Sequence, residues 1–352
     1  MRIDNNIWVG NVELHLKEKD WFNHNHHHHD AQYDNIILHV ICEKEPSKNL
    51  TGHRTLNLYP SIKWECILEY QKLMDSMDVL ACRSYLPKLN QHRKSLWLES
   101  LGLERLLEKL SSYSKSHNTK EPNLDYHLLY LIVRSFGFSA NSIGFETLSD
   151  KLTPFMLQRI KDKPKQIETL LLGLAGFYLS PEEGAEFQLL SNKFKVTPIS
   201  DKYWVKGAVR PSNSPLLRLK QLSRLLCVLG ELSELLSLKT EKYDIVNFMA
   251  SIDMQPQLSK SVIDHIIINA IAPFVFIVGK STSNTEFTDY GMSLLTSCKA
   301  ESNRFVKLYK DAGMTIENAL ESQGALRLFK HYCRPKKCLN CAIGNELILK
   351  HD

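Results

Sequence analysis

The sequence predicts an α+β protein, with a small amino-terminal β-sheet followed by a predominantly helical body. From Ile7 to Lys17 apolar and polar residues alternate, which is the period of a strand with one apolar and one polar face. Ile36 to Ile41 is a second run of β-branched and aliphatic residues. After Pro60, apolar residues recur three and four positions apart, which is typical of helices.

The strand elements follow from these patterns in chain order. In the first strand, Val12, Leu14 and Leu16 share one face, and Glu13, His15 and Lys17 share the other. A polar loop over residues 18–35 leads to the second strand, and a third short strand is predicted at residues 54–58. Most polar strand faces are solvated, so we expect the apolar face to be the buried one.

The remainder of the chain is predicted to be helical. The apolar spacing predicts helices at residues 61–74, 89–113, 124–136, 166–178, 214–229, 260–277 and 317–332. The apolar stretch 266–279 is shorter than the roughly 20 residues of a membrane-spanning helix, which predicts a buried core helix. Polar, Pro-containing segments favour a division into residues 1–60, 61–210 and 211–352.

Composition excludes some classes of protein. With 352 residues, 43% of them hydrophobic, the chain can bury more than one core. A net charge of +5 is a mild basic excess, so nucleic acid is a possible partner, but this is no dense Lys and Arg footprint. No apolar segment of a secretion signal follows Met1, which predicts a cytoplasmic protein without a membrane partner.

Carboxylate and imidazole groups gather near the amino terminus. Candidate metal ligands there are Glu13, His15, His24, His26 and Asp30, and His39 on the second strand completes the candidate catalytic set of Glu13, His15 and His39. Imidazole with carboxylate suits zinc, manganese, iron or nickel, whereas carboxylate with water suits magnesium. The alternative is that His39 is a hydrogen-bonded core histidine and the loop histidines are surface residues.

A second candidate metal site lies near the carboxyl terminus. Cys333, Cys338 and Cys341 follow His331 closely, and a C-x2-C pair is a common half of a structural zinc site. An iron–sulfur cluster would instead recruit Cys298 or Cys227 as a fourth cysteine. The alternatives are a terminal turn without metal, or a redox-sensitive site whose thiols are activated by the neighbouring lysines.

Several stretches resemble a bacterial family of unknown function. They are Trp8-Val9-Gly10-Asn11-Val12-Glu13-Leu14-His15, Tyr33-Asp34-Asn35, Ile37-Leu38-His39-Val40, Phe136-Gly137-Phe138, Arg210-Pro211-Ser212-Asn213, and Tyr332-Cys333 with Lys336-Lys337-Cys338-Leu339 and Cys341. The chain is identified as a member of that family. In its members a Pro-Asp element precedes the strand matching residues 7–16, and the combination is similar to the PD-(D/E)XK nuclease core.

This resemblance implies roles for two residues. Glu13 would be the second metal carboxylate of the nuclease core, and His15 would stand in the position of its lysine, with a lower pKa and a shorter reach. The Pro-Asp strand would precede Trp8, so we expect either that Met1 is an internal methionine or that the protein is a shortened relative. Without that strand we expect little or no catalysis.

Three functions follow as hypotheses. The first is a metal-dependent nuclease or phosphodiesterase-like protein that uses magnesium or manganese at Glu13 and His15. The second is a non-enzymatic scaffold or binding protein whose cysteine cluster holds zinc or an iron–sulfur group. The third is a histidine-rich metal carrier that uses His24 and His26.

Overall fold

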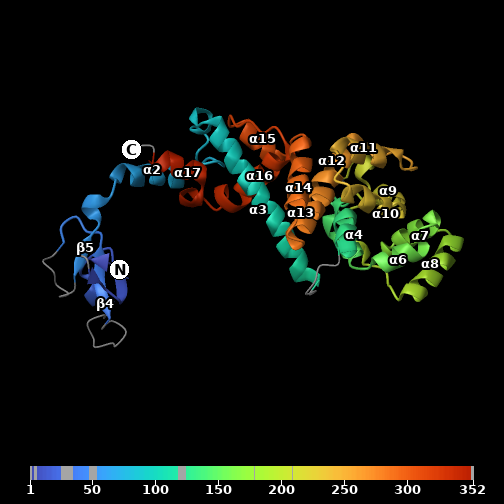
Figure 1. Ribbon diagram of the computed structural model, residues 1–352, viewed down its shortest axis with the longest axis horizontal. Helices are drawn as coiled ribbons and strands as arrows, with labels where there is room; N and C mark the ends of the chain where they lie inside the picture. Colours follow the sequence, from blue (N-terminus) through green and yellow to red (C-terminus); the bar gives the residue numbers. More distant parts are fainter. Residues whose placement is uncertain are drawn as a thin grey trace. The chain divides into compact units, whose positions relative to one another are not determined.

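The computed structural model of the protein describes residues 2–3, 6–24, 35–46, 54–117, 124–177, 179–207 and 209–349. The chain forms two units, one of Met1–Ser76 with Gly344–Asp352 and one of Met77–Ile343. We call them the amino-terminal unit and the helical unit (Figure 1). The predicted three-part division remains a prediction.

The amino-terminal unit contains a three-stranded parallel sheet, in the order β3 (Asn11–Leu14), β4 (Ile36–Ile41) and β5 (Thr55–Asn57). A separate antiparallel pair joins β1 (Arg2–Ile3) to β2 (Asn6–Ile7). Because parallel strands need a crossover, the connection from β3 to β4 is long and contains the short helix α1 (Asp20–Asn23). The predicted α+β class is confirmed, since 64% of the chain is helical beside this small sheet.

The register of the sheet fixes which residues share a face. Glu13 of β3 lies opposite His39 of β4, and His39 lies opposite Thr55 of β5. The pairing continues past β3, where the backbone N–H of His15 donates to the carbonyl of Val40 at 2.9 Å. Paired residues on neighbouring strands project to the same side, so Glu13 and His39 face the same way.

The burial of the two faces of β3 is the reverse of what the sequence predicts. The apolar side chains of Leu14 and Leu16 are 69% and 74% exposed, whereas the side chain of His15 is only 3% exposed. The expectation that the apolar face is the buried one is therefore wrong. The physical reason is that α1 packs against the polar face, where its Trp21 covers His39.

Helices account for the remaining elements. The amino-terminal unit holds α2 (Trp64–Asp75), and α17 (Ala342–Leu349) ends the described chain. The helical unit contains α3 (Gln91–His117), α4 (Leu124–Ser135), α5 (Ser142–Ser149), α6 (Pro154–Ile160), α7 (Pro164–Leu174), α8 (Pro181–Phe194), α9 (Pro215–Cys227), α10 (Leu229–Ser237), α11 (Lys242–Ser251), α12 (Lys260–Ile266), α13 (Ala272–Ser281), α14 (Thr285–Ser297), α15 (Arg304–Lys310) and α16 (Ala319–Leu328). Each predicted helix corresponds to one of these or to two in succession.

Three helices begin at a hydroxyl residue followed by proline. The side chains of Thr153, Ser180 and Ser214 accept hydrogen bonds from backbone N–H groups in the first turns of α6, α8 and α9. A hydroxyl at this position satisfies an N–H that has no partner within the helix, and proline at the next position gives up no helical hydrogen bond. These helix starts are therefore encoded locally.

The most apolar helical run spans Lys260–Ser281 and includes α12, a π-helical turn at Ile267–Ile271 and α13. By length and composition this 22-residue run could cross a membrane, so the prediction that it is too short is wrong. Its apolar window is 78% buried within the structure, which confirms the prediction of a core helix.

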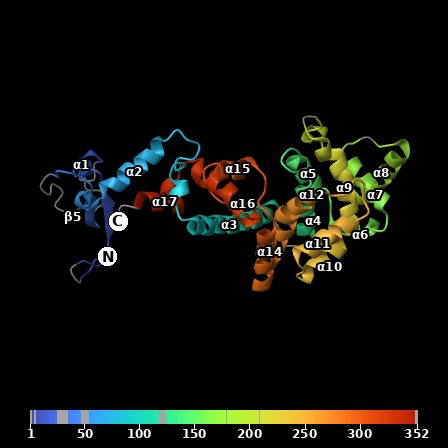
Figure 2. The same cartoon turned by 90° about the horizontal axis from the view of Figure 1, so that it is seen from above.

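Helices α3 and α16 pack with their backbones unusually close together, side by side in both views (Figures 1 and 2). A Cβ atom at Gly324 of α16 would overlap the carbonyl oxygen of Leu98 in α3, and one at Gly102 of α3 would press on the carbonyl of Leu320. Only glycine allows this approach. The contact joins a helix from the first third of the chain to one near its end.

Candidate functional site

The polar face of the amino-terminal sheet carries the first candidate site. Glu13 lies on β3, His15 directly follows that strand, and His39 lies within β4. His39 is fully buried, and the side chain of Glu13 is 27% exposed. The sheet therefore brings together the three residues that sequence reasoning named as a catalytic set.

His15 lies at the centre of this cluster. Its Nδ1 is 2.9 Å from Nε2 of His39, and its Nε2 is 3.2 Å from Nδ1 of His24. The same Nε2 is 3.7 Å from Oε1 of Glu13. Each pair of ring nitrogens needs one proton and one lone pair, so the three rings form a chain of donors and acceptors.

Helix α1 covers the cluster with the indole of Trp21. The indole of Trp21 is 3% exposed, and its ring centre lies 5.1 Å from that of His39 and 6.2 Å from that of His15. This apolar cover restricts the access of water to the buried His39. Glu13 and His24 lie toward the more open side.

A carboxylate at the start of α1 influences the charge of the cluster. Burial opposes the ionisation of Asp20, but hydrogen bonds from the Lys17 N–H and the Asn23 amide, with the nearby His15 and His24, lower its pKa overall. Asp20 therefore stays ionised beside the cluster.

Two of the predicted metal ligands, His26 and Asp30, lie outside the described residues. Within the described part of the chain, no three His, Cys, Asp or Glu side chains already surround a point where a metal ion could sit. The amino-terminal cluster is therefore a hydrogen-bonded network whose members approach one another without forming a finished metal cage.

The predicted partners of the carboxyl-terminal cysteines lie in three different places. His331 Nε2 is 3.6 Å from a carboxylate oxygen of Glu108. The sulfur of Cys298 is 3.9 Å from Asp264, and the thiol of Cys227 donates to the carbonyl of Ser223 at 3.2 Å. His331 shares the π-helical turn Phe329–Cys333 with Cys333, whereas Cys298 and Cys227 lie at the ends of α14 and α9. Cys82, which the sequence presents as an isolated thiol, is the cysteine that lies close to Cys333, Cys338 and Cys341.

Sequence reasoning also missed a basic cavity in the helical unit. A cavity of about 160 Å³ is lined by charged and polar groups, which include Arg105, Lys109, Arg134, His265 and Asn269. Burial lowers the pKa of Lys109 to about 7, and the positive charge of Arg105 acts in the same direction. Arg105 and Lys109 are four residues apart on α3, but glutamates beside them make the stretch read as an ordinary ion-paired helix surface.

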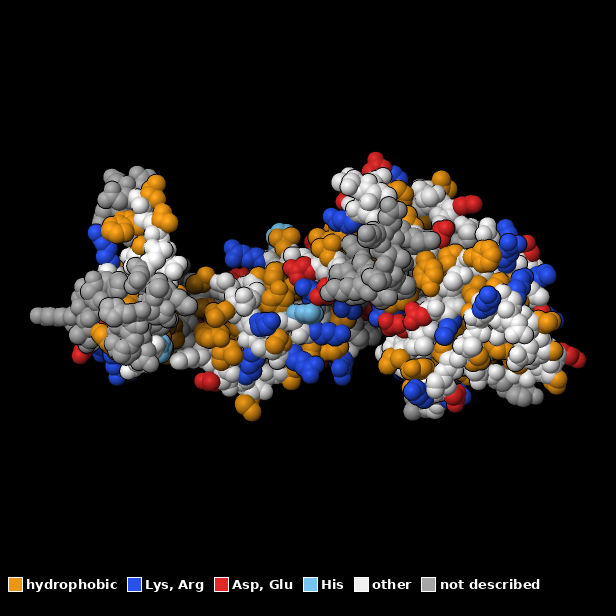
Figure 3. Space-filling view, turned by 90° about the horizontal axis from the view of Figure 1, so that it is seen from below, with side chains coloured by type: hydrophobic (Ala, Val, Ile, Leu, Met, Phe, Trp, Pro, Cys, Tyr) orange, Lys and Arg blue, Asp and Glu red, His pale blue; other side chains and the backbone are white. Residues whose placement is uncertain are grey.

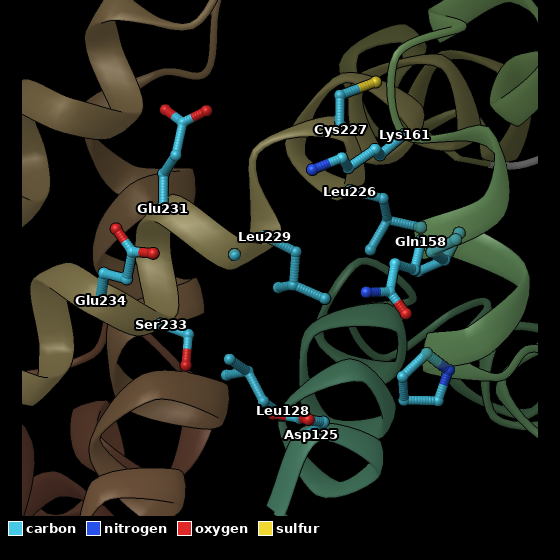
Figure 4. Close-up of a pocket in the computed structure, with 13 residues that line it drawn as sticks. Asp125, Leu128, Gln158, Lys161, Leu226, Cys227, Leu229, Glu231, Ser233 and Glu234 are labelled. Carbon is cyan, nitrogen blue, oxygen red and sulfur yellow. The ribbon is translucent and has the colours of Figure 1, made fainter.

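A larger cavity of about 400 Å³ lies among α4, α6, α9 and α10. Figure 4 shows Lys161 and Gln158 on one side, Glu231 and Glu234 on the other, and Leu229 between them. The charged groups lie apart and do not converge on one point. This cavity has the size of a small-molecule site but shows no catalytic arrangement.

The surface charge agrees with the mild basic excess of the sequence. On the face drawn in Figure 3, Lys and Arg side chains are interspersed with Asp and Glu over most of the molecule. The described residues of that face therefore show no continuous basic groove of the kind that favours binding to a polyanion.

Comparison with known proteins gives one assignment. No curated protein and no solved structure matches the chain. A family model described as "Protein of unknown function (DUF2851)" matches residues 1–304, which include the amino-terminal cluster and Cys82 but end before Cys333. The match covers well over half of the chain, and the protein therefore belongs to the DUF2851 family.

Proposed function

We propose that this protein is a divalent-metal-dependent hydrolase of phosphodiesters, similar to a nuclease, and that its reaction centre is the cluster of Glu13, His15 and His24. The observation that carries the proposal is the convergence of Oε1 of Glu13 and Nδ1 of His24 on the same nitrogen of His15. The phosphodiester as substrate rests on the resemblance of residues 7–16 to the nuclease core.

The distances in the cluster are close to those between ligands of one ion. Ligand atoms about 2.1 Å from a tetrahedral metal ion lie roughly 3.4 Å from one another. The observed separations from His15 Nε2 are 3.2 Å and 3.7 Å. Small side-chain rotations of Glu13 and His24 would therefore let the three groups face a common ion.

His39 supplies the support that a metal-binding histidine needs. It is buried and holds the other ring nitrogen of His15 at 2.9 Å, which fixes the orientation of that ring. A mixed set of one carboxylate and two imidazoles favours manganese or zinc over magnesium. Such an ion would lower the pKa of a bound water and stabilise the charge that develops on the phosphate.

The test is hydrolysis by the full-length chain. A chromogenic phosphodiester, single-stranded DNA, double-stranded DNA and RNA are each incubated with manganese, with magnesium or with a chelator. Because His24, 3.2 Å from His15, would supply a ligand in addition to those that the resemblance implies, we expect metal-dependent cleavage where the resemblance alone implied little or none. This cleavage should fall by about 100-fold or more in Glu13→Gln and His15→Gln. Glu45→Gln is the matched control, because Glu45 is an exposed glutamate of the same unit.

Absence of cleavage in every combination, together with no binding of manganese by the native chain, would overturn the proposal. A binding or scaffold role would then be favoured. The observation that supports this alternative is the exposed apolar outer face of β3, where Leu14 and Leu16 are largely open to solvent. Unpaired apolar surface of this kind is typical of sites that contact another macromolecule.

A further inference from the structure

Four cysteines of the helical unit come from two segments that are far apart in the sequence. Cys82 precedes α3, whereas Cys333, Cys338 and Cys341 follow α16. Cys341 is 7% exposed, and the other three are partly buried. The amino-acid sequence shows three of these as a cluster and gives no sign of the fourth.

Packing of the segment before α3 explains how Cys82 reaches the others. The backbone of Gly313, after α15, lies against the ring of Pro87, so that a Cβ on this glycine would be 2.9 Å from Cγ of the proline. The side chain of Gln91 donates to the carbonyl of Thr315 at 3.1 Å. The carbonyl of Cys82 itself accepts from the N–H of Leu86, which ties Cys82 to this packed segment.

Tyr309 of α15 forms a bridge between the two segments. It is 1% exposed, and its hydroxyl lies 3.1 Å from the sulfur of Cys333. Cys333, Cys82 and Cys341 all interact electrostatically with Tyr309. The hydroxyl therefore lies among three of the four thiols, and it can donate its proton to a thiolate there.

A tight turn brings Cys338 and Cys341 back toward Cys333. Lys336 adopts a left-handed backbone conformation with φ of 53°, and its N–H donates to the carbonyl of Cys333. The N–H of Cys341 donates to the carbonyl of Cys338 at 3.2 Å and closes a second turn. A C-x2-C pair closed by a turn of this kind is typical of one half of a zinc site.

The thiols interact with one another electrostatically. Cys341 and Cys338 both interact with Cys82, and Cys341, Cys82 and Cys338 all interact with Cys333. Interactions of this kind require short distances, and a cation at the centre would reverse their sign.

We propose that Cys82, Cys333, Cys338 and Cys341 together bind one zinc ion, and that the hydroxyl of Tyr309 donates to the sulfur of Cys333. Four thiolates in a tetrahedral array are a closed structural site for zinc. The side chains as described do not already surround one point where a metal ion could sit, so zinc binding requires the thiols to turn. Rotation about one cysteine χ1 moves its sulfur by roughly 3 Å, which lets each thiol turn toward a common centre. Zinc with four thiolates carries a net negative charge, and Lys336 and Lys337 lie in the turn beside it.

The site would connect the start of the helical unit to its end. It requires neither His331 nor Cys298 nor Cys227, whose described contacts are with Glu108, Asp264 and Ser223. The proposed zinc site does not depend on the proposed hydrolase activity. Its ligands belong to the helical unit, whereas the hydrolase cluster belongs to the amino-terminal unit.

The test measures metal content in the full-length protein purified under reducing conditions without chelator. We expect about one zinc per chain by elemental analysis and by native mass spectrometry. Cobalt added to the zinc-free protein should give the intense visible bands of a tetrahedral thiolate site. Cys82→Ser and Cys338→Ser should each weaken cobalt binding by at least about 10-fold.

Cys227→Ser is the matched control and should bind cobalt as the wild type does. Circular dichroism of each variant shows whether it folds. If a variant fails to fold, the cobalt spectrum of the wild type still tests the site. Failure of the wild type to bind zinc or cobalt would overturn the proposal. So would wild-type affinity in Cys82→Ser, or a brown protein that contains iron and sulfide in place of zinc.

Discussion

The histidine cluster and the cysteine cluster are assembled in opposite ways. The histidine cluster takes its described members from residues 13–39, which lie on neighbouring strands and on the short helix between them. The cysteine cluster joins Cys82 to residues 333–341, and only the packing of the helical unit brings them together. Strand register brings Glu13 and His39 together, and the short connection through α1 adds His24, whereas the second cluster depends on the packing of the helical unit.

The two units also differ in which side chains they bury. In the amino-terminal unit a polar strand face points inward and its apolar face points outward. In the helical unit the helices bury an extended core of apolar side chains. Four substitutions test how each region is held together, from the largest expected effect to the smallest.

Gly324→Ala should break the contact between α3 and α16. The added Cβ would overlap the carbonyl oxygen of Leu98, so the helices must separate. We expect a loss of about 3 kcal/mol in the free energy of unfolding, measured with urea, and weaker zinc binding by the cysteines. Gly230→Ala is the control, because nothing lies within 4 Å of the added atom there. Equal stability of the two variants would contradict the close packing.

His39→Leu should disrupt the histidine cluster alone. Nδ1 of His15 then loses its hydrogen bond to His39 in a buried environment, which should lower the free energy of unfolding by about 1–3 kcal/mol. We expect lower stability in urea and unchanged cobalt spectra at the cysteines. The exposed His92→Leu serves as the control. A change in the cobalt spectrum would show that the clusters are not independent.

Lys109→Met tests the basic cavity through the pH dependence of stability. The folded protein holds the pKa of Lys109 at about 7, below the usual 10.5, because of burial and of Arg105 and Arg134, with Glu301 acting in the opposite direction. His265 also faces this group. Below about pH 7 both the folded and the unfolded chain carry the proton on Lys109. The folded state then bears the full free-energy cost of burying this charge.

From about pH 7 to pH 10.5 the unfolded chain keeps this proton and the folded chain has lost it, so this group makes stability rise with pH. Lys109→Met should therefore stabilise the protein at pH 6, by on the order of 2 kcal/mol, and much less at pH 9.5. Urea unfolding at both pH values measures the difference. The exposed Lys165→Met should show no such dependence, and a Lys109→Met effect that is equal at both pH values would contradict the assignment.

Leu14→Lys should have the smallest effect. The side chain is 69% exposed on the outer face of β3, so we expect a change in stability within about 0.5 kcal/mol. Val40→Lys, on the neighbouring strand, should be strongly destabilising because Val40 is 7% exposed. Similar losses from the two substitutions, measured by thermal unfolding, would show that the outer face of β3 is covered in solution.

Much of the secondary structure could be predicted from local patterns. The run of β-branched residues from Ile36 to Ile41 corresponds to β4 residue for residue. Long helices such as α3 and α9 also follow from their apolar spacing. Helices α6 and α8 were not predicted, although Thr153-Pro154 and Ser180-Pro181 mark their first residues. Helix α6 has only 7 residues, and α8, with 14, buries only Phe187 and Leu190, so neither carries a clear apolar stripe.

The candidate sites were only partly predictable. The two-residue period placed Glu13 and His15 on one face, and the structure brings His15 close to both Glu13 and His24. The period could not indicate that this face is buried, because Trp21 covers it from a separate helix. No local pattern marks Cys82 or distinguishes Lys109 from the other lysines of α3.

The sequence by itself determined the periods of strands and helices, the positions of several helix caps and the spacing of three cysteines. These depend on residues that are neighbours along the chain, where sterics and hydrogen bonding act over a few positions. The tertiary structure alone decided which face of β3 is buried and which distant thiol joins Cys333. Burial and proximity depend on what packs from elsewhere in the chain, and close packing through glycines such as Gly324 settles that only when the whole unit has formed.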